Sequence, residues 1–165
     1  VTKEWHTPKD KIYKIAQILF RPPLEKITWR LISSLSNRFP KFIFNQMLPS
    51  FSKLSYEEMM RKMAEGDIDE VRKMNNRQRS GHGFLIDLSQ TKEITFTDLQ
   101  TISCPTLIMH SKHDGSVSFE HALYAHQQIS DSELCLLDSW GHLIWLGQDS
   151  DNVNETLVEF LTCYS

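Results

Sequence analysis

Two apolar runs of strand length, each followed by a polar turn, organise the C-terminal part of this chain. The first run is Thr106–His110, and the turn after it carries Asp114. The second run is Glu133–Asp138, and the turn after it carries His142. A helical pattern at Phe119–Ile129 lies between the two runs. The order predicts a strand–helix–strand unit, in which a crossover helix joins two parallel strands.

The two turns are expected to lie at the same edge of the predicted sheet. Parallel strands present their carboxyl ends together, and this is where α/β proteins place their functional sites. Asp114 and His142 could therefore meet across neighbouring strands, as a catalytic acid and base do. Each residue alone is ordinary, because aspartate is common in turns and Gly-His is a common dipeptide. The pair also needs a nucleophile, and this stretch of sequence does not supply one.

Residues 1–80 are predicted to be almost entirely helical, in short pieces separated by proline and glycine. Helical periodicity predicts three segments: 8–19, a second that starts at Leu24 and stops before Phe39-Pro40, and 41–48, which Pro49 closes. A capping box at Ser55–Glu58 starts a further helix, which Gly66 is expected to close. The next helix begins at Asp67 and ends near residue 80. After the two strands, a last helix is expected at 153–162, with Asp151 or Asn152 as its cap.

The composition is that of a soluble globular domain. The chain has 165 residues, of which 40% are hydrophobic and 24% charged. No apolar run reaches the roughly 18 residues that a membrane span needs, and the first residues contain no apolar signal core. Three cysteines, at positions 104, 135 and 163, cannot all pair with one another. This favours a reducing compartment, and a cytoplasmic location is expected.

The charge is distributed unevenly along the chain. Residues 1–80 hold 16 Lys and Arg against 9 acids, a net charge of +7, whereas residues 81–165 hold 2 against 12, a net charge of −10. The simplest explanation is two solvated surfaces of different composition. The alternative is a basic layer over an acidic one, or a basic entrance that attracts anionic substrates.

Several classes of site are not expected. The sequence has no glycine-rich phosphate loop and no dinucleotide fingerprint. It lacks a basic patch interleaved with aromatics after residue 80, so a nucleic acid partner is not expected. The spacing of His110, His113, Asp114 and His121 matches no closed zinc pattern. Neither a metal nor a cofactor is therefore predicted.

Over residues 97–165 the sequence resembles the C-terminal part of α/β-hydrolase fold enzymes. The resemblance rests on the run from Ile102 to Asp114, on the helix after it, and on Ser139-Trp-Gly-His142. In that family the acid follows the penultimate core strand and the histidine follows the last one, and both come after the nucleophile. The resemblance implies that Asp114 is the acid of the triad and His142 its general base. It also implies that Val117 and Phe119 lie near the mouth of the site.

Residues 1–95 resemble, in position and style, the variable lid of that family. The implied fold class is α/β, a partial α/β-hydrolase fold. A helical lid at 1–95 would be followed by the last strand–helix–strand–helix of a parallel sheet at 96–165. Residues 1–80 hold five of the six methionines and five of the nine phenylalanines. Met59, Met63 and Phe42 are therefore candidates for lining an adaptable substrate pocket, with ordinary core packing as the alternative.

The sequence departs from the family pattern at the nucleophile. A Gly-x-Ser-x-Gly elbow is absent, and Ser80-Gly-His-Gly does not replace it, because it neither follows a strand nor has the right order. Gly115 also stands where the family often has proline. The nucleophile and the oxyanion hole are therefore expected outside this chain, in an N-terminal half. The chain alone is expected to be inactive, and to associate with that half or with a second copy.

The resemblance favours a hydrolase that acts on an ester or related acyl bond of a small molecule. Epoxide hydrolases, dehalogenases and carbon–carbon hydrolases share the Asp…His ending, so an Asp nucleophile in place of Ser is an open alternative. A second hypothesis comes from another class of protein. The chain would then be a non-catalytic helical interaction module fused to a hydrolase remnant, acting through the surface of its basic helical part.

Overall fold

The computed structural model describes residues 14–15, 18–78, 83, 85–86 and 96–164. These residues form two compact units. The first unit contains residues 47–67 together with the C-terminal part from 96 onward, and the second contains the remaining described residues. A division at residue 95 stays a prediction, but the helical segment 47–67 packs with the C-terminal part of the chain.

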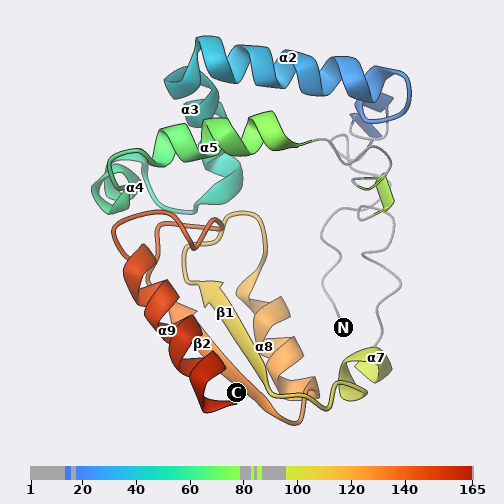
Figure 1. Cartoon of the computed structure of the whole chain (residues 1–165), viewed down its shortest axis with the longest axis vertical. Coiled ribbons are helices and arrows are strands. Elements are labelled where there is room, and N and C mark those ends of the chain that lie inside the picture. Colours follow the sequence, from blue (N-terminus) through green and yellow to red (C-terminus); the bar gives the residue numbers. More distant parts are fainter. Residues whose placement is uncertain (1–13, 16–17, 79–82, 84, 87–95, 165) are drawn as a thin grey trace. The chain divides into compact units, whose positions relative to one another are not determined.

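The first unit is built on two parallel strands. Strand β1 (Thr106–Ser111) pairs with β2 (Ser132–Leu137), and the register runs from Thr106 opposite Ser132 to Ser111 opposite Leu137. Helix α8 (Phe119–Gln128) connects the strands and packs against both of them (Figure 1). The predicted strand–helix–strand unit is confirmed, with element ends that differ from the prediction by one residue. Both carboxyl ends lie at the same edge of the sheet, as the parallel pairing requires.

Two helices flank this unit in the chain. Helix α7 (Phe96–Gln100) precedes β1 and packs against α8. Helix α9 (Ser150–Cys163) follows β2 and starts earlier than predicted, with Asp149 rather than Asp151 or Asn152 at its N-cap. The hydroxyl of Tyr164 donates to Glu133 Oε1 of β2 at 3.2 Å, which ties the end of α9 to the sheet.

Helix α4 (Tyr56–Lys62) belongs to the first compact unit. Its capping box is confirmed: the Ser55 side chain accepts from the backbone N–H of Glu58, and the Glu58 carboxylate accepts from the backbone N–H of Ser55. The prediction that this helix continues to Gly66 is wrong. The helix ends earlier, because Met63 is already extended at φ −72° and ψ 145°. Gly66 instead takes φ +99° in the turn before α5, a conformation that glycine adopts readily.

The second unit contains α2 (Leu24–Arg38), the start of α3 (Pro40–Phe51) and most of α5 (Asp67–Arg77). Polar side chains join α2 to α5: the amide of Asn75 donates to Ser36 Oγ at 3.1 Å, and Arg72 donates to Asn37 Oδ1 at 2.8 Å. Four apolar residues of α2 are exposed instead: Leu24, Ile27, Leu31 and Leu35. The first predicted helix, 8–19, lies mostly outside the described residues.

The prediction that Pro49 closes the third helix is wrong. Helix α3 continues to Phe51 with Pro49 inside it. Proline lacks one N–H group, and the turn continues because the N–H of Ser52 donates to the carbonyl oxygen of Leu48 at 3.0 Å. The helix therefore delivers Phe51 and Ser52 directly to the C-terminal sheet unit. None of the helices among the described residues has the length and apolar character to cross a membrane.

Candidate active site

The structure brings the two predicted site residues into direct contact. Nδ1 of His142 lies 2.9 Å from Oδ2 of Asp114. Asp114 stands in the turn after β1, and His142 stands after β2, so the parallel pairing of the strands places both at one sheet edge. The carboxyl side chain is 5% exposed, whereas the imidazole is 37% exposed. The acid is therefore enclosed, and the histidine keeps an open side.

Backbone groups fix the carboxylate of Asp114. Its Oδ1 atom accepts from the N–H of Ser116 at 2.7 Å and from the N–H of Val117 at 2.8 Å. Aspartate often accepts hydrogen bonds from backbone N–H groups two or three residues further along. With Oδ1 occupied in this way, Oδ2 is the oxygen that faces His142.

This geometry selects one tautomer of His142. A carboxylate only accepts hydrogen bonds, so the proton of the contact must sit on Nδ1 of the imidazole. In the neutral ring Nε2 then carries the lone pair. The arrangement leaves a base on the atom that does not face the acid, which is how a catalytic histidine is set up to take a proton.

The residues before α4 also contact the pair, and the sequence did not predict this. The carbonyl oxygen of Phe51 accepts from the N–H of Gly115 at 3.1 Å and from the N–H of His142 at 2.8 Å. The Phe51 ring lies parallel to the imidazole of His142, with 6.4 Å between the ring centres. The one sequence signal was the presence of glycine directly after Asp114 and directly before His142, since glycine permits close backbone approach.

A second histidine lies near the same carboxylate oxygen of the acid. His110, at the end of β1, is buried, and its Nε2 lies 3.9 Å from Asp114 Oδ2 without a hydrogen-bond partner in the described part of the chain. Burial lowers the pKa of the His110 imidazole, while the nearby charge of Asp114 opposes that shift. At neutral pH this ring is therefore uncharged and leaves the Asp114 carboxylate to His142.

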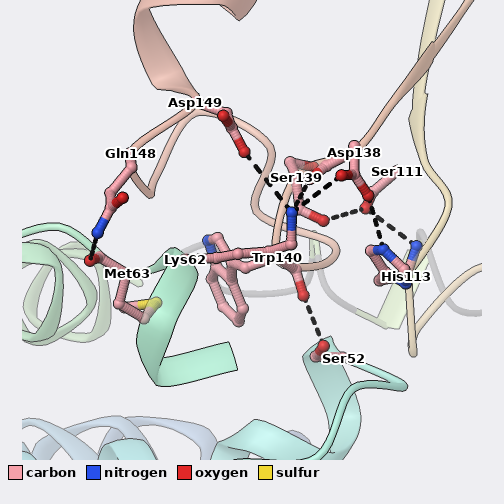
Figure 2. A network of polar contacts seen from close by, with 10 residues as sticks. All are labelled: Ser52, Lys62, Met63, Ser111, His113, Asp138, Ser139, Trp140, Gln148 and Asp149. Carbon is pink, nitrogen blue, oxygen red and sulfur yellow. Dashed lines mark hydrogen bonds and ion pairs between the residues drawn. The ribbon is translucent and has the colours of Figure 1, made fainter. Parts of the chain in front are cut away.

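The same unit contains a second aspartate–histidine contact, which differs in its surroundings. Nε2 of His113 lies 2.9 Å from Asp138 Oδ1, and Nζ of Lys62 lies 3.1 Å from Asp138 Oδ2 (Figure 2). Two hydrogen bonds hold the pKa of the Asp138 carboxyl below its ordinary value. The one from His113 has the larger effect, and the one from Lys62 adds to it. The Asp138 side chain is 63% exposed, so this contact is a solvated network at the surface.

The other predicted site residues are distributed over both units. Val117 binds the acid through its backbone, and Phe119 packs against His110 with 5.8 Å between ring centres. Met59 and Met63 are buried in the first unit, at 1% and 7% exposure. Phe42 lies in the second unit and is 61% exposed. Within the described ranges, His, Cys, Asp and Glu side chains form no group of three that could hold a metal ion.

Comparison with known proteins agrees with this architecture. The chain is 55% identical, over 161 residues, to the uncharacterized hydrolase YcgS of Bacillus subtilis, covering 98% of the chain and 57% of that protein. It therefore spans little more than half the length of this curated relative. No protein-family model matches the sequence.

Solved structures also match most of the chain. An alpha/beta hydrolase fold protein from Nakamurella multipartita superposes with a TM-score of 0.71 at 24% identity, covering 98% of this chain and 57% of that one. An esterase from Exiguobacterium antarcticum superposes with a TM-score of 0.52 at 22% identity, covering 83% and 48%. At these identities the structural likeness concerns the fold.

Proposed function

We propose that this chain, which matches part of the α/β-hydrolase fold and is similar in sequence to a hydrolase, supplies the acid and the general base of a hydrolase. The observation that carries the proposal is the 2.9 Å contact between His142 Nδ1 and the enclosed carboxylate of Asp114. The nucleophile and the oxyanion hole would lie outside this chain, in the portion of its relatives that it does not cover.

The proposed mechanism assigns each side chain one task. Nε2 of His142 takes the proton of the nucleophile as it attacks the acyl carbon, and returns a proton to the leaving group. Asp114 keeps the proton of the resting ring on Nδ1 and stabilises the positive charge that forms on the imidazole. The hydrogen bonds from Ser116 and Val117 keep the carboxylate oriented toward the ring during this cycle.

The favoured substrate is a small-molecule ester or a related acyl compound. The similarity in fold to an esterase supports this choice, although an Asp nucleophile and epoxide, carbon–halogen or carbon–carbon chemistry would use the same Asp–His pair. Val117 and Phe119 would border the bound substrate. Val117 donates its N–H to Asp114, and the ring of Phe119 packs against His110, which lies near the same carboxylate. A cytoplasmic location agrees with the three free thiols.

Steady-state kinetics of the complete protein test the proposal. We expect His142→Ala to reduce turnover of a p-nitrophenyl ester by orders of magnitude with little change in melting temperature. His113→Ala is the matched control, because it removes the other histidine that contacts an aspartate at 2.9 Å. Equal effects of the two substitutions, or wild-type turnover in His142→Ala, would refute the assignment.

A fluorophosphonate probe separates the proposed chemistry from its alternatives, because it labels only an activated serine. Labelling that depends on His142 would identify a serine hydrolase. If the complete protein stays unlabelled but still hydrolyses substrate, an Asp nucleophile is indicated. Absence of both labelling and turnover would favour the non-catalytic interaction module.

A further inference from the structure

The segment Phe51–Lys53, which begins with the last residue of α3 and leads toward α4, contacts the loops of both proposed catalytic residues. The carbonyl oxygen of Phe51 joins the two loops, as described above. Ser52 forms an isolated antiparallel bridge with Asp114. The N–H of Lys53 donates to the carbonyl oxygen of His113 at 2.9 Å, immediately before Asp114. Three consecutive residues thus bind the backbone around the acid and the base.

The side chain of Ser52 adds a buried link to the histidine loop. Its hydroxyl donates to the carbonyl oxygen of Trp140 at 2.5 Å (Figure 2). The same hydroxyl accepts from the N–H of Leu54 at 3.1 Å. Ser52 is 8% exposed and Trp140 is 1% exposed. A buried carbonyl oxygen that loses its partner is costly, so this hydroxyl constrains the backbone two residues before His142.

Two glycines make room for the segment. A Cβ atom on Gly115 would lie 2.8 Å from the backbone nitrogen of Ser52, and one on Gly141 would lie 2.4 Å from the carbonyl oxygen of Phe51. Neither distance is tolerated between non-bonded atoms, and in each case the obstacle is backbone. A glycine therefore directly follows Asp114 and another directly precedes His142, at the two positions where the backbone of this segment comes closest.

We propose that Ser52 is a positioning residue for the Asp114–His142 pair, and this inference rests on the proposed function. Asp114 is already oriented by two N–H groups of its own loop, from Ser116 and Val117. The histidine loop is held instead by the segment Phe51–Lys53. The N–H of His142 donates to the Phe51 carbonyl oxygen, and the carbonyl oxygen of Trp140 accepts from the Ser52 hydroxyl. Loss of that hydroxyl lets the histidine loop move relative to a fixed acid.

The test compares Ser52→Ala with Ser52→Cys in the complete protein. Cysteine has the same side-chain connectivity as serine, but its thiol is a weak hydrogen-bond donor, so it weakens the link to Trp140 without removing the side chain. We expect kcat to fall by about 10- to 100-fold in Ser52→Ala, with KM nearly unchanged, and in the same direction but less in Ser52→Cys. Ser55→Ala is the control, because it removes the nearby α4 cap without touching either catalytic loop.

The NMR resonance of the proton on His142 Nδ1 gives a readout that does not depend on turnover. Asp114→Asn, which removes the charged acceptor, identifies this resonance. We expect Ser52→Ala and Ser52→Cys to shift or broaden it, and Ser55→Ala to leave it in place. If both folded Ser52 variants keep the wild-type resonance and kcat, the positioning role is refuted. If the resonance responds while His142→Ala retains full turnover, positioning stands and the proposed catalytic function fails.

Discussion

The backbone N–H of His142 donates to the carbonyl oxygen of Phe51 at 2.8 Å, and the N–H of Gly115 donates to the same oxygen at 3.1 Å. One carbonyl oxygen from the helical part of the sequence therefore serves the loops of both the proposed acid and the proposed base. Removal of residues 47–67 would leave both N–H groups without this acceptor. These residues are structurally part of the site unit, although they precede it by a long stretch of chain.

Asp114→Asn should abolish most activity while the fold is retained. The asparagine oxygen can still accept from Ser116 and Val117, but the neutral amide no longer stabilises a charged imidazole or imposes the same tautomer. We expect kcat to fall by about 10⁴-fold. Asp138→Asn, at the other aspartate–histidine contact, should leave kcat near the wild-type value. Similar losses in both variants would show that the enclosure of Asp114 has no catalytic meaning.

Gly141→Ala should disrupt the site through the backbone. The new methyl group would lie 2.4 Å from the Phe51 carbonyl oxygen, so the histidine loop must move. We expect a loss of about 1–3 kcal/mol in the free energy of unfolding and a fall in kcat of the folded protein. Urea unfolding and kinetics measure the two effects.

Gly66→Ala is the matched control for that substitution. Gly66 has a positive φ but no atom within 4 Å of the added methyl group, so its cost is conformational, about 1–2 kcal/mol. Its kcat should not change, because Gly66 lies in neither of the two loops that carry the proposed catalytic residues. A Gly141→Ala variant with wild-type kcat would contradict the close approach of Phe51.

His110 should make the protein less stable in mild acid. Burial lowers its pKa below the ordinary value of 6.5, so below that pH the unfolded chain binds the proton more readily than the folded one. The free energy of unfolding contributed by this group is therefore complete above pH 6.5 and decreases as the pH falls toward the folded-state pKa. His110→Gln, which cannot titrate, should show a smaller decrease between pH 7.5 and 5. Identical decreases would rule out a neutral buried His110.

The isolated 165-residue chain should associate with itself or with the N-terminal half and should lack esterase activity. In the described residues β1 pairs only with β2, and its apolar residues Leu107 to Met109 remain half-buried. An apolar strand with an unpaired edge is a template for another chain. Light scattering with and without the N-terminal half measures the association. A stable monomer that hydrolyses p-nitrophenyl acetate, and loses that activity in His142→Ala, would contradict this prediction.

The sequence predicted those features that depend on local pattern. The strand–helix–strand unit follows from the apolar runs around Ile108 and Leu134. Because the crossover helix makes the two strands parallel, the loops after both strands lie at the same sheet edge. The α4 start follows from the Ser55–Glu58 capping box. Each is encoded within a few neighbouring residues, so each could be identified without tertiary information.

Features that depend on packing could not be predicted in this way. The end of α3 depends on where Phe51 and Ser52 make their tertiary contacts, and these outweigh the signal of Pro49. The role of Ser52 is invisible in sequence because its partner, the Trp140 carbonyl oxygen, is distant along the chain. Gly115 and Gly141 marked the loops for close approach, but nothing in the sequence indicated which segment approaches them.

A double-mutant cycle on turnover tests the central claim most directly, which is that Asp114 and His142 act as one unit. The kcat values of the wild type, Asp114→Asn, His142→Ala and the double variant are measured in the complete protein. If the acid acts only through the histidine, the double variant is no slower than His142→Ala alone, because residues of one catalytic unit are not additive. If the two losses multiply in the double variant, the residues act independently, and the 2.9 Å contact between them is not a catalytic pair.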